Sequence, residues 1–303
     1  MPAHPRVIAL IATRFRAELL ARLLASLARQ TVHPVAAVIC DNGPEDATAA
    51  AAQQSSLSCE LICPGKNLGF GGGLAAAGQK AFEKFPDLTH LLIVDDDAIL
   101  APRDLESLLA STAKHSAGSV APFLTDDSGK LREVPEPVSW ALARAFRAAG
   151  PNLEKARALA PGGYPMAWCI GPCVLIDKQT WLRAGPPRDD MLAYGDDVEF
   201  SLRLSAASPA WAEPSVTVIH APPPSSSPLP PLADTAHFKK FGMLLQNLAF
   251  TCVISPRPRH LPLYLFGNAK RFIRTFGHTP ASLLEIGRRL LWGFLGRPAG
   301  ISP

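Results

Sequence analysis

The sequence lacks any apolar run that is long enough to cross a lipid bilayer. Its first apolar stretch, residues 7–12, is short, and Arg14 and Arg16 follow it closely, which is not typical of a secretory signal peptide. We therefore expect neither a transmembrane anchor nor a signal peptide. The catalytic part of the protein is expected to stay in the cytoplasm.

Net charge is also low. A formal charge of +4 on 303 residues does not indicate a nucleic-acid partner. Basic residues nevertheless gather in the last part of the chain, where acids are few: Lys239, Lys240, Arg257, Arg259, Lys270, Arg271, Arg274, Arg288, Arg289 and Arg297. This tail is a candidate for peripheral contact with the anionic inner face of a membrane. Aromatic residues beside arginine in residues 283–295 favour an interfacial helix, and core packing or an oligomer contact explains them equally well.

Two glycine motifs that bind nucleotides are missing. The chain has no Gly-Lys-Ser/Thr, and no G-x-G-x-x-G follows its first predicted strand, which argues against a Walker A loop and a dinucleotide fingerprint. Six cysteines are present, and the pairs Cys59/Cys63 and Cys169/Cys173 share one spacing. Because both pairs lie in strand-like apolar sequence, buried reduced thiols explain them better than a zinc site does.

The remaining sequence predicts an α/β fold. Apolar runs at residues 7–12, 35–40, 60–63 and 91–94 read as buried strands, and helical patterns at 19–27 and 74–85 lie between them. Repeated strand, helix, strand order indicates a parallel sheet with right-handed crossovers. In the first of these helices, Arg16, Arg22 and Arg29 are expected on the outer surface.

The second half is more varied. It predicts a helix at 104–113, a strand at 120–124, a polar excursion or lid at 126–163 with a short helix at 140–147, a hairpin-like strand pair within 166–176 and a strand at 216–219. Residues 194–200 open a helix with three acids in its first turns, where the helix dipole favours negative charge.

Three adjacent carboxylates, Asp95, Asp96 and Asp97, follow the fourth strand directly. Ligands gather beyond the carboxyl ends of strands in such sheets, and adjacent carboxylates repel one another unless a cation compensates. Hard oxygen ligands favour Mg²⁺ or Mn²⁺. A divalent metal that holds a phosphate-bearing substrate is one interpretation, and a solvated acidic loop is the other.

A glycine-rich segment, residues 67–73, lies between the third strand and the next helix. Four glycines in five positions allow a close approach of the backbone, so this loop is a candidate for binding a phosphate or a sugar at a helix N-terminus. A plain tight turn is the alternative.

Taken together, these motifs resemble inverting family 2 glycosyltransferases with the GT-A fold, in particular rhamnosyltransferase-like and galactofuranosyltransferase-like members. The resemblance covers about residues 6–250 and rests on the order of four motifs: 41–43, 67–73, 95–97 and 195–203. It implies a Rossmann-like, mostly parallel central sheet flanked by helices, with a C-terminal helical extension. It also implies a UDP- or dTDP-sugar donor, Mn²⁺ or Mg²⁺, and transfer with inversion at the anomeric carbon. From the basic, aromatic tail we expect a lipid-linked or cell-envelope glycan as the acceptor.

The resemblance also implies residue roles. Asp197 matches the general base that deprotonates the acceptor hydroxyl, and Asp95, Asp97 and His220 match the metal ligands. The implied acceptor-binding residues are Asp196, Glu199 and Trp168. The implied donor-binding residues are Thr13, Arg14, Asp41, Asn67, Gly69, Gly72, Asp95 and Asp96, among which Asp41 matches the acid that accepts from the pyrimidine base.

One motif departs from the family. Residues 13–16 read Thr-Arg-Phe-Arg where relatives often have Thr-Tyr-Asn-Arg, which puts base recognition near Thr13 and Arg14 in question. Two other classes of protein stay open: a sugar nucleotidyltransferase and a catalytically inactive carbohydrate-binding relative. The expected organisation is a catalytic domain at 1–222, a Pro/Ser-rich loop at 223–236 and a helical extension at 237–303.

Overall fold

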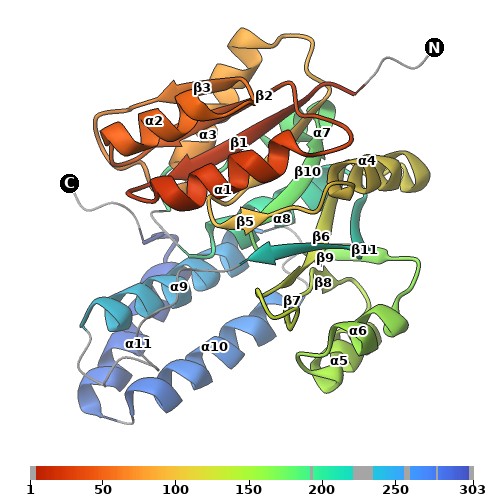
Figure 1. Ribbon diagram of the computed structural model, residues 1–303. Helices are drawn as coiled ribbons and strands as arrows, with labels where there is room; N and C mark the ends of the chain where they lie inside the picture. The colour runs from red at the N-terminus through yellow and green to blue at the C-terminus, as the bar shows by residue number, and fades with distance from the viewer. Residues whose placement is uncertain (1–4, 192–193, 221–234, 256–259, 278, 300–303) are drawn as a thin grey trace.

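The structure is a computed structural model, which describes residues 5–191, 194–220, 235–255, 260–277 and 279–299. A mixed sheet runs through the molecule with helices on both of its faces (Figure 1). Its strands are β1 (Val7–Thr13), β2 (Ala36–Asp41), β3 (Cys59–Ile62), β4 (His90–Val94), β5 (Ala98–Ile99), β6 (Ser119–Thr125), β7 (Leu131–Glu133), β8 (Glu136–Pro137), β9 (Tyr164–Trp168), β10 (Cys173–Asp177) and β11 (Ala210–His220).

The first half of the sheet is parallel. Strands β3, β2, β1 and β4 lie side by side in that order, and each neighbouring pair runs in the same direction. The connections contain α1 (Ala17–Ala28), α2 (Asp46–Gln54) and α3 (Gly69–Lys84). Parallel strands need such crossovers, so the repeated strand and helix patterns of the sequence lead directly to this half. The predicted α/β class is confirmed.

Burial on both faces explains the continuous apolar strands. Along β1, Ile8 and Leu10 belong to one hydrophobic core and Ala9 and Ile11 to the other, because successive side chains of a strand point to opposite faces. The core that contains Leu10 includes residues of α3, and the one that contains Ile11 includes residues of α1. The carboxyl ends of these strands are therefore fixed in position by packing from both sides.

The predicted hairpin within 166–176 is wrong. Its two strands form, but β10 pairs with β4 and β6, whereas β9 pairs with β11 and β8. The reason is burial, because Val174 and Ile176 enter one core while Cys173 and Leu175 enter the other. A strand that is apolar on both faces is most stable in the middle of the sheet, and β10 lies there antiparallel to both neighbours.

The segment 126–163 contains the short strands β7 and β8 and two helices. These are α5 (Trp140–Ala149) and α6 (Leu153–Leu159), so the helix predicted at 140–147 is confirmed. Helix α4 (Asp104–His115) precedes this segment, and α7 (Lys178–Ala184) and α8 (Asp196–Ala207) follow it. Strand β11 ends at His220, on the edge of the sheet that carries the ends of β1 and β4.

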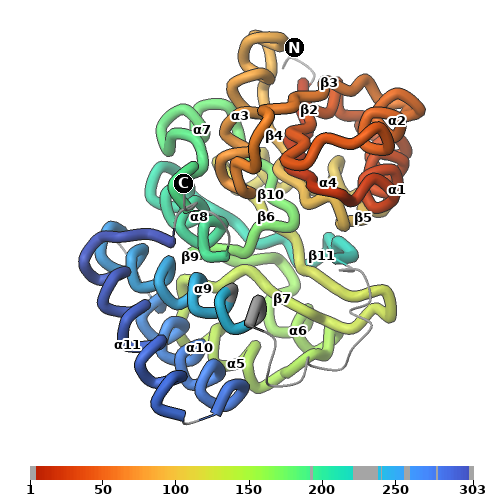
Figure 2. The backbone as a smooth tube through the Cα atoms, turned by 90° about the vertical axis from the view of Figure 1, so that its left-hand side faces the viewer, coloured from red at the N-terminus to blue at the C-terminus, as the bar shows by residue number. Residues whose placement is uncertain are grey.

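The chain ends in α9 (Thr235–Ile254), α10 (Leu261–Phe276) and α11 (Pro280–Phe294). Figures 1 and 2 both show these helices below the sheet and next to each other. They form a third core with Trp168, Val198 and Leu202. Of the Pro/Ser-rich loop predicted at 223–236, residues 223–234 lie outside the described residues. No helix in the described ranges is long and apolar enough to cross a membrane.

All six cysteines are free thiols. Cys40, Cys169 and Cys173 are buried, as predicted, and burial raises the pKa of the Cys169 thiol to about 12. Cys63 is exposed, so the prediction of buried thiols fails at that position.

Candidate active site

The candidate residues lie where neighbouring strands end. Thr13 ends β1 and is in register with Asp41, which ends β2, and Asp95 follows the last residue of β4. His220 ends β11, where it pairs with Ala98 of β5, just after the three aspartates. Segments that are far apart in sequence therefore meet at one edge of the sheet, as the strand assignment predicted.

Asp95, Asp97 and His220 each offer one ligand atom, and these atoms lie within 4.8 Å of one another. The Nε2 atom of His220 is 3.2 Å from Oδ1 of Asp97 and 3.9 Å from Oδ2 of Asp95. Two carboxylates and one imidazole suit a divalent cation. In the part of the chain that the structure describes, this is the one such group of three metal-ligating side chains.

Electrostatics also favour a cation here. Burial and the charge of Asp97 raise the pKa of Asp95, because each disfavours a second negative charge at this point. The Oδ1 atom of Asp95 is buried and accepts no hydrogen bond from any described residue. One imidazole does not balance the negative charge of this cluster. A bound divalent ion would supply the missing positive charge and a partner for the Oδ1 atom of Asp95. The donor set therefore fits the predicted metal.

Asp96 is held by its own chain. The hydroxyl of Thr13 donates to its Oδ2 atom at 2.7 Å, and Arg16 donates to its Oδ1 atom at 3.0 Å. The same guanidinium nitrogen donates to Asp97 at 3.2 Å. Arg16 is exposed, as predicted, but its guanidinium lies at the site, which was not predicted. The three adjacent aspartates were the sequence signal for this contact, because they require a nearby positive charge.

A crevice of about 540 Å³ opens beside these groups. Six of the predicted donor-binding residues line it: Thr13, Arg14, Asn67, Gly69, Asp95 and Asp96. Six lining residues were not predicted: Ala12, Arg16, Asn42, Phe70, Tyr194 and Met243. The last of these comes from α9, so the C-terminal helices contribute to the crevice. No local sequence signal marks Met243, because only packing brings α9 to this edge.

Asp41 and Gly72 lie behind the crevice wall. Asp41 is buried, its Oδ1 atom accepts from the Gly43 backbone at 3.0 Å, and its Oδ2 atom has no partner among described residues. Gly72 is buried too, and a side chain there would meet Leu68 at 3.1 Å. One carboxylate oxygen of Asp41 is therefore left without a partner among the described residues, whereas Gly72 serves packing.

The glycine-rich segment is not a loop. Helix α3 begins at Gly69 and includes the three glycines that follow, so the prediction of a loop is wrong. A Cβ atom at Gly71 would lie 2.3 Å from the backbone oxygen of Arg188, which shows why glycine is required. The amide of Gly71 donates to Oδ2 of Asp196 at 3.1 Å. The glycines thus bring the first turn of α3 against the segment before α8.

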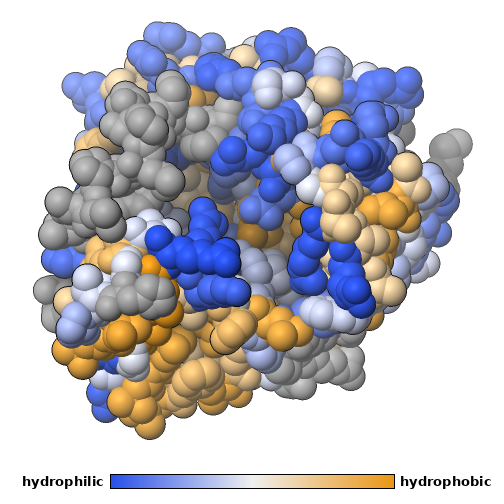
Figure 3. Space-filling model, turned by 90° about the horizontal axis from the view of Figure 1, so that it is seen from below, coloured by the Kyte–Doolittle hydropathy of each residue, from blue (hydrophilic) through white to orange (hydrophobic). Residues whose placement is uncertain are grey.

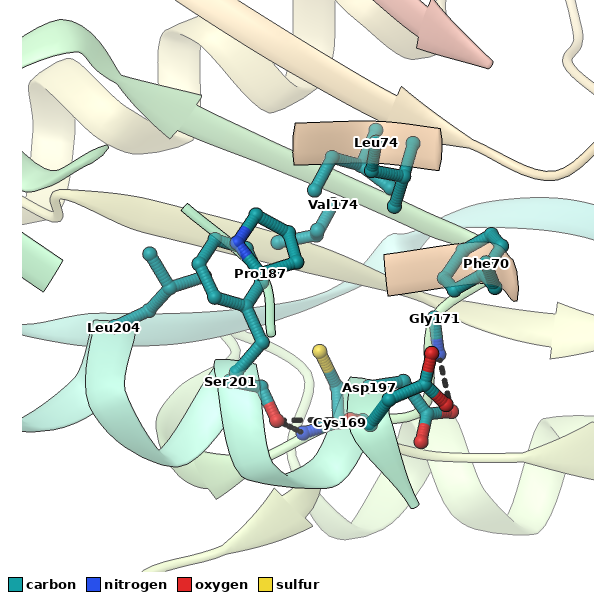
Figure 4. Close-up of a pocket in the computed structure, with 12 residues that line it drawn as sticks. Phe70, Leu74, Cys169, Gly171, Val174, Pro187, Asp197, Ser201 and Leu204 are labelled. Atoms are coloured by element: carbon teal, nitrogen blue, oxygen red, sulfur yellow. Dashed lines mark hydrogen bonds between the residues drawn. The ribbon is translucent and has the colours of Figure 1, made fainter. Parts of the chain in front are cut away.

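Asp197 lies at the start of α8. Its Oδ2 atom accepts from the Gly171 amide at 2.9 Å and its Oδ1 atom accepts from the Val198 amide at 2.7 Å. Figure 4 shows Asp197 beside Gly171 and Phe70 at the wall of a small internal cavity. Burial raises the pKa of Asp197, and the backbone N–H groups oppose that rise. Its charge in turn raises the pKa of Asp95, so Asp197 lies within electrostatic reach of the group formed by Asp95, Asp97 and His220.

The other two acids of α8 are bound by the protein. Asp196 is buried against α3, and burial together with the charge of Asp197 raises its pKa to about 7. Glu199 is buried and accepts from Arg203 at 2.7 and 2.9 Å. Both carboxylates therefore stabilise the first turns of α8. Trp168 is also buried, its ring lies 4.8 Å from that of Tyr264, and its indole N–H has no acceptor among the described residues.

A mixed α/β sheet with a crevice and an Asp-Asp-His group at its carboxyl edge is the arrangement expected of a GT-A fold. Residues 8–178, more than half of the chain, match the family model described as Glycosyl transferase family 2. The chain belongs to this family and is a glycosyltransferase, as its motifs predicted.

One similar protein is the N-acetylglucosaminyl-diphospho-decaprenol L-rhamnosyltransferase of Mycobacterium tuberculosis (strain CDC 1551 / Oshkosh). It is 26% identical over 247 residues, which cover 75% of this chain and 80% of the relative. The enzyme of the same name from strain ATCC 25618 / H37Rv gives the same values.

Solved structures share the fold. TarS 1–349 from S. aureus superposes with a TM-score of 0.64 at 12% identity, covering 95% of this chain and 80% of that one. The mannosyltransferase PcManGT from Pyrobaculum calidifontis, in complex with GDP-Man and Mn²⁺, superposes with a TM-score of 0.58 at 18% identity. The superposition covers 96% of this chain and 81% of that one. These likenesses confirm the GT-A fold and the central sheet flanked by helices.

Proposed function

We propose that the protein is a metal-dependent inverting glycosyltransferase that moves a rhamnose-like or galactofuranose-like sugar from a UDP- or dTDP-sugar to a lipid-linked or cell-envelope glycan. The observation that carries this proposal is the placement of Asp197 beside the group formed by Asp95, Asp97 and His220. Similarity to the mycobacterial N-acetylglucosaminyl-diphospho-decaprenol L-rhamnosyltransferase supports a rhamnosyl donor and a lipid-linked acceptor. We also propose residues 1–222 as the catalytic domain.

On the donor side, the nucleotide diphosphate occupies the crevice beside β1 and β4. The free Oδ2 atom of Asp41 is the proposed acceptor for an N–H group of the base. Asp95, Asp97 and His220 are proposed to hold Mn²⁺ or Mg²⁺, which neutralises charge on the departing diphosphate. Arg16 fixes the carboxylates of Asp96 and Asp97 and adds a positive charge at the crevice.

On the acceptor side, Asp197 is the proposed general base. Its carboxylate takes the proton of the attacking hydroxyl while that oxygen forms the bond to the anomeric carbon. A raised pKa makes the carboxylate a stronger base than a solvated aspartate, and the two backbone N–H groups fix its orientation. Inversion follows if attack and departure occur on opposite faces of that carbon.

The C-terminal helices are proposed to contact the inner face of a membrane. Figure 3 shows hydrophobic side chains gathered over the side of the molecule where Figure 1 places these helices. The exposed apolar residues of α10 and α11 are Leu263, Phe266, Leu283, Leu284, Leu291 and Phe294. Exposed basic residues on the same helices, Lys270 and Arg274 among them, complement an anionic leaflet. Such a contact would bring the crevice to a lipid-linked acceptor.

A nucleotide-sugar panel tests the function. The purified full-length chain is incubated with UDP-, dTDP- and GDP-sugars and Mn²⁺ or Mg²⁺, and release of the nucleoside diphosphate is measured. One donor should be hydrolysed slowly without an acceptor and faster with a polyprenyl-diphosphate-linked sugar. If no donor is cleaved under any of these conditions, an inactive carbohydrate-binding role replaces the proposal.

A further inference from the structure

The lining of the crevice is polar in one part and apolar in another. Where β1 and β4 end, its side chains are mainly polar or charged, whereas Phe70, Tyr194 and Met243 contribute larger apolar groups. These three residues, which we call the apolar wall, come from the first turn of α3, the segment before α8 and the first half of α9. They are far apart in sequence, so packing between these segments creates the wall.

A hydrogen bond between α3 and α8 holds the first two members of the wall close to each other. The amide of Gly71 donates to Oδ2 of Asp196 at 3.1 Å, which joins the first turn of α3 to the first turn of α8. Phe70 and Tyr194 each stand within two positions of one of these bonded residues. Their backbones are therefore fixed relative to one another, although more than one hundred residues separate them.

Helix α9 holds the backbone of Tyr194 in an uncommon conformation. Tyr194 has a left-handed backbone, with φ 61°, and Gly195 follows with φ 87°. The side chain of Asn247 in α9 donates to the Tyr194 carbonyl oxygen at 2.9 Å, and its own oxygen accepts from the Ala299 amide at 2.7 Å. Asn247 is fully buried, so both bonds are shielded from water. Met243 lies one turn earlier on the same face of α9, so one helix places two members of the wall.

The side chain of Tyr194 gains little from this arrangement within the protein. It is 48% exposed, and it makes no hydrogen bond and no ring contact with any other residue that the structure describes. A left-handed backbone is strained for an aromatic residue, whereas glycine or asparagine accepts it at a lower cost. Such strain persists only where other contacts fix it, and it gathers at ligand sites. An exposed ring held in this way at a crevice indicates that a ligand is its partner.

The position of the apolar wall shows which part of the ligand it meets. In the proposed reaction, the donor sugar lies between the metal-bound diphosphate and the base Asp197. Asp95 lines the same crevice as the apolar wall. Figure 4 shows Phe70 beside Asp197, and both residues line one internal cavity. The wall therefore extends from the crevice that contains the metal ligand Asp95 to the base, which is the place of the donor sugar.

An aromatic ring suits this place chemically. One face of a pyranose or furanose ring presents C–H groups, and these pack on the flat apolar face of a tyrosine or phenylalanine ring. The phosphates and the base of the nucleotide need charged and polar partners instead, which the other part of the crevice supplies. Contact with the apolar wall is therefore expected for the sugar and not for the nucleotide.

We infer that Tyr194 binds the sugar of the nucleotide-sugar donor with the face of its ring, as part of the apolar wall with Phe70 and Met243. The inference rests on the proposed function, because it assumes a nucleotide-sugar donor in the crevice. It adds a residue that distinguishes the nucleotide sugar from the free nucleoside diphosphate.

Binding of a nucleotide with and without its sugar tests this role. Calorimetry in Mn²⁺ measures the dissociation constants of dTDP and dTDP-rhamnose, and of UDP and UDP-galactofuranose, for the full-length protein. Tyr194→Asn removes the ring at a left-handed position that asparagine accepts, and Tyr194→Phe keeps the ring. Phe15→Asn is the matched control, because Phe15 is also an exposed aromatic residue with a positive φ, 54°, but does not line the crevice.

Tyr194→Asn should weaken binding of the nucleotide sugar at least about fivefold, since the ring contact is lost, and should change the affinity for the nucleoside diphosphate by less than about twofold. Tyr194→Phe should match the wild type for both ligands. Phe15→Asn should leave the ratio of the two affinities within about twofold of the wild-type ratio. The melting temperature of Tyr194→Asn should equal or exceed that of the wild type, because backbone strain is relieved.

Two results would overturn the inference while the proposed function stands. One is an unchanged ratio of the two affinities in Tyr194→Asn. The other is equal weakening of both ligands, which would assign Tyr194 to the nucleotide or to packing. Failure of the proposed function has a different signature: the wild type then binds neither nucleotide in Mn²⁺, and the inference falls with it.

Discussion

Replacing Asp197 with asparagine separates the proposed base from a merely structural carboxylate. The substitution is nearly isosteric, so the donor crevice and the metal group should stay intact. An amide takes no proton at neutral pH, and loss of a general base lowers kcat by roughly two to four orders of magnitude, or about 3 to 5 kcal/mol in the barrier. The affinity for the donor should change little, because the proposed role of this carboxylate is on the acceptor side.

The structure also gives the stability cost of this change. Both carboxylate oxygens accept backbone N–H groups, from Gly171 and Val198. An asparagine oxygen can replace only one of them, and its NH₂ group would face the other donor, which costs about 1 to 3 kcal/mol for an unsatisfied buried group. Loss of the charge beside Asp196 offsets part of this, since Asp197 helps to raise the pKa of Asp196. A melting temperature lowered by a few degrees is expected.

Asp177→Asn provides the matched control. Asp177 accepts from the backbone and the hydroxyl of Thr180 at 2.8 and 2.7 Å, but it pairs with His90 at the opposite edge of the sheet. Steady-state kinetics with donor and acceptor, together with nucleotide binding by calorimetry, should show lost kcat only for Asp197→Asn. An unchanged kcat would refute the assignment of the base. A parallel loss of donor affinity would mean that Asp197 binds the metal or the donor.

Three further predictions follow from the same contacts. His220→Ala should weaken Mn²⁺ binding, measured by electron paramagnetic resonance, while the melting temperature stays close to that of the wild type; equal Mn²⁺ affinity would make His220 structural. Gly71→Ala should destabilise the fold by about 1 to 3 kcal/mol in urea unfolding, since its Cβ would lie 2.3 Å from a backbone oxygen, and an unchanged midpoint would disprove the packing argument. Sedimentation of the protein with anionic liposomes should decline as salt rises. It should also fall in the double variant Phe266→Ser/Leu284→Ser, because the wild-type side chains are 68% and 74% exposed. If the full-length chain does not bind liposomes at low salt, α10 and α11 are packing or dimer elements.

Much of the first half of the fold could be predicted because its signals are local. The buried strands β1, β2 and β4 are continuous apolar runs, and their ends carry Thr13, Asp41 and Asp95. Once these strands are parallel, their carboxyl ends must meet, so the site followed from the strand assignment. The place of His220 in the metal group was predicted only through the family resemblance, because this residue lies more than one hundred residues from the aspartates.

The errors have one physical cause, which is tertiary contact between distant segments. Position 71, within α3, requires glycine because a backbone oxygen of Arg188 lies against it, and no residue near the glycines in the sequence predicts that neighbour. The strands β9 and β10 are joined by a short turn, yet burial on both faces takes β10 into the middle of the sheet. Arg16 lies on the surface as its spacing predicted, and what the sequence did not show is its contact with two carboxylates that lie about eighty residues further along the chain.

The most direct test of the account is the dependence of nucleotide binding on the metal group. Thermal unfolding of the wild type and of Asp97→Asn is measured with UDP, dTDP or GDP, in Mn²⁺ and in EDTA. A ligand that binds only the native state raises the melting temperature. We predict that one nucleotide stabilises the wild type in Mn²⁺, that EDTA removes most of this effect, and that Asp97→Asn shows little in either condition. Equal stabilisation in Mn²⁺ and EDTA, or by Asp97→Asn and the wild type, would contradict a metal held by Asp95, Asp97 and His220.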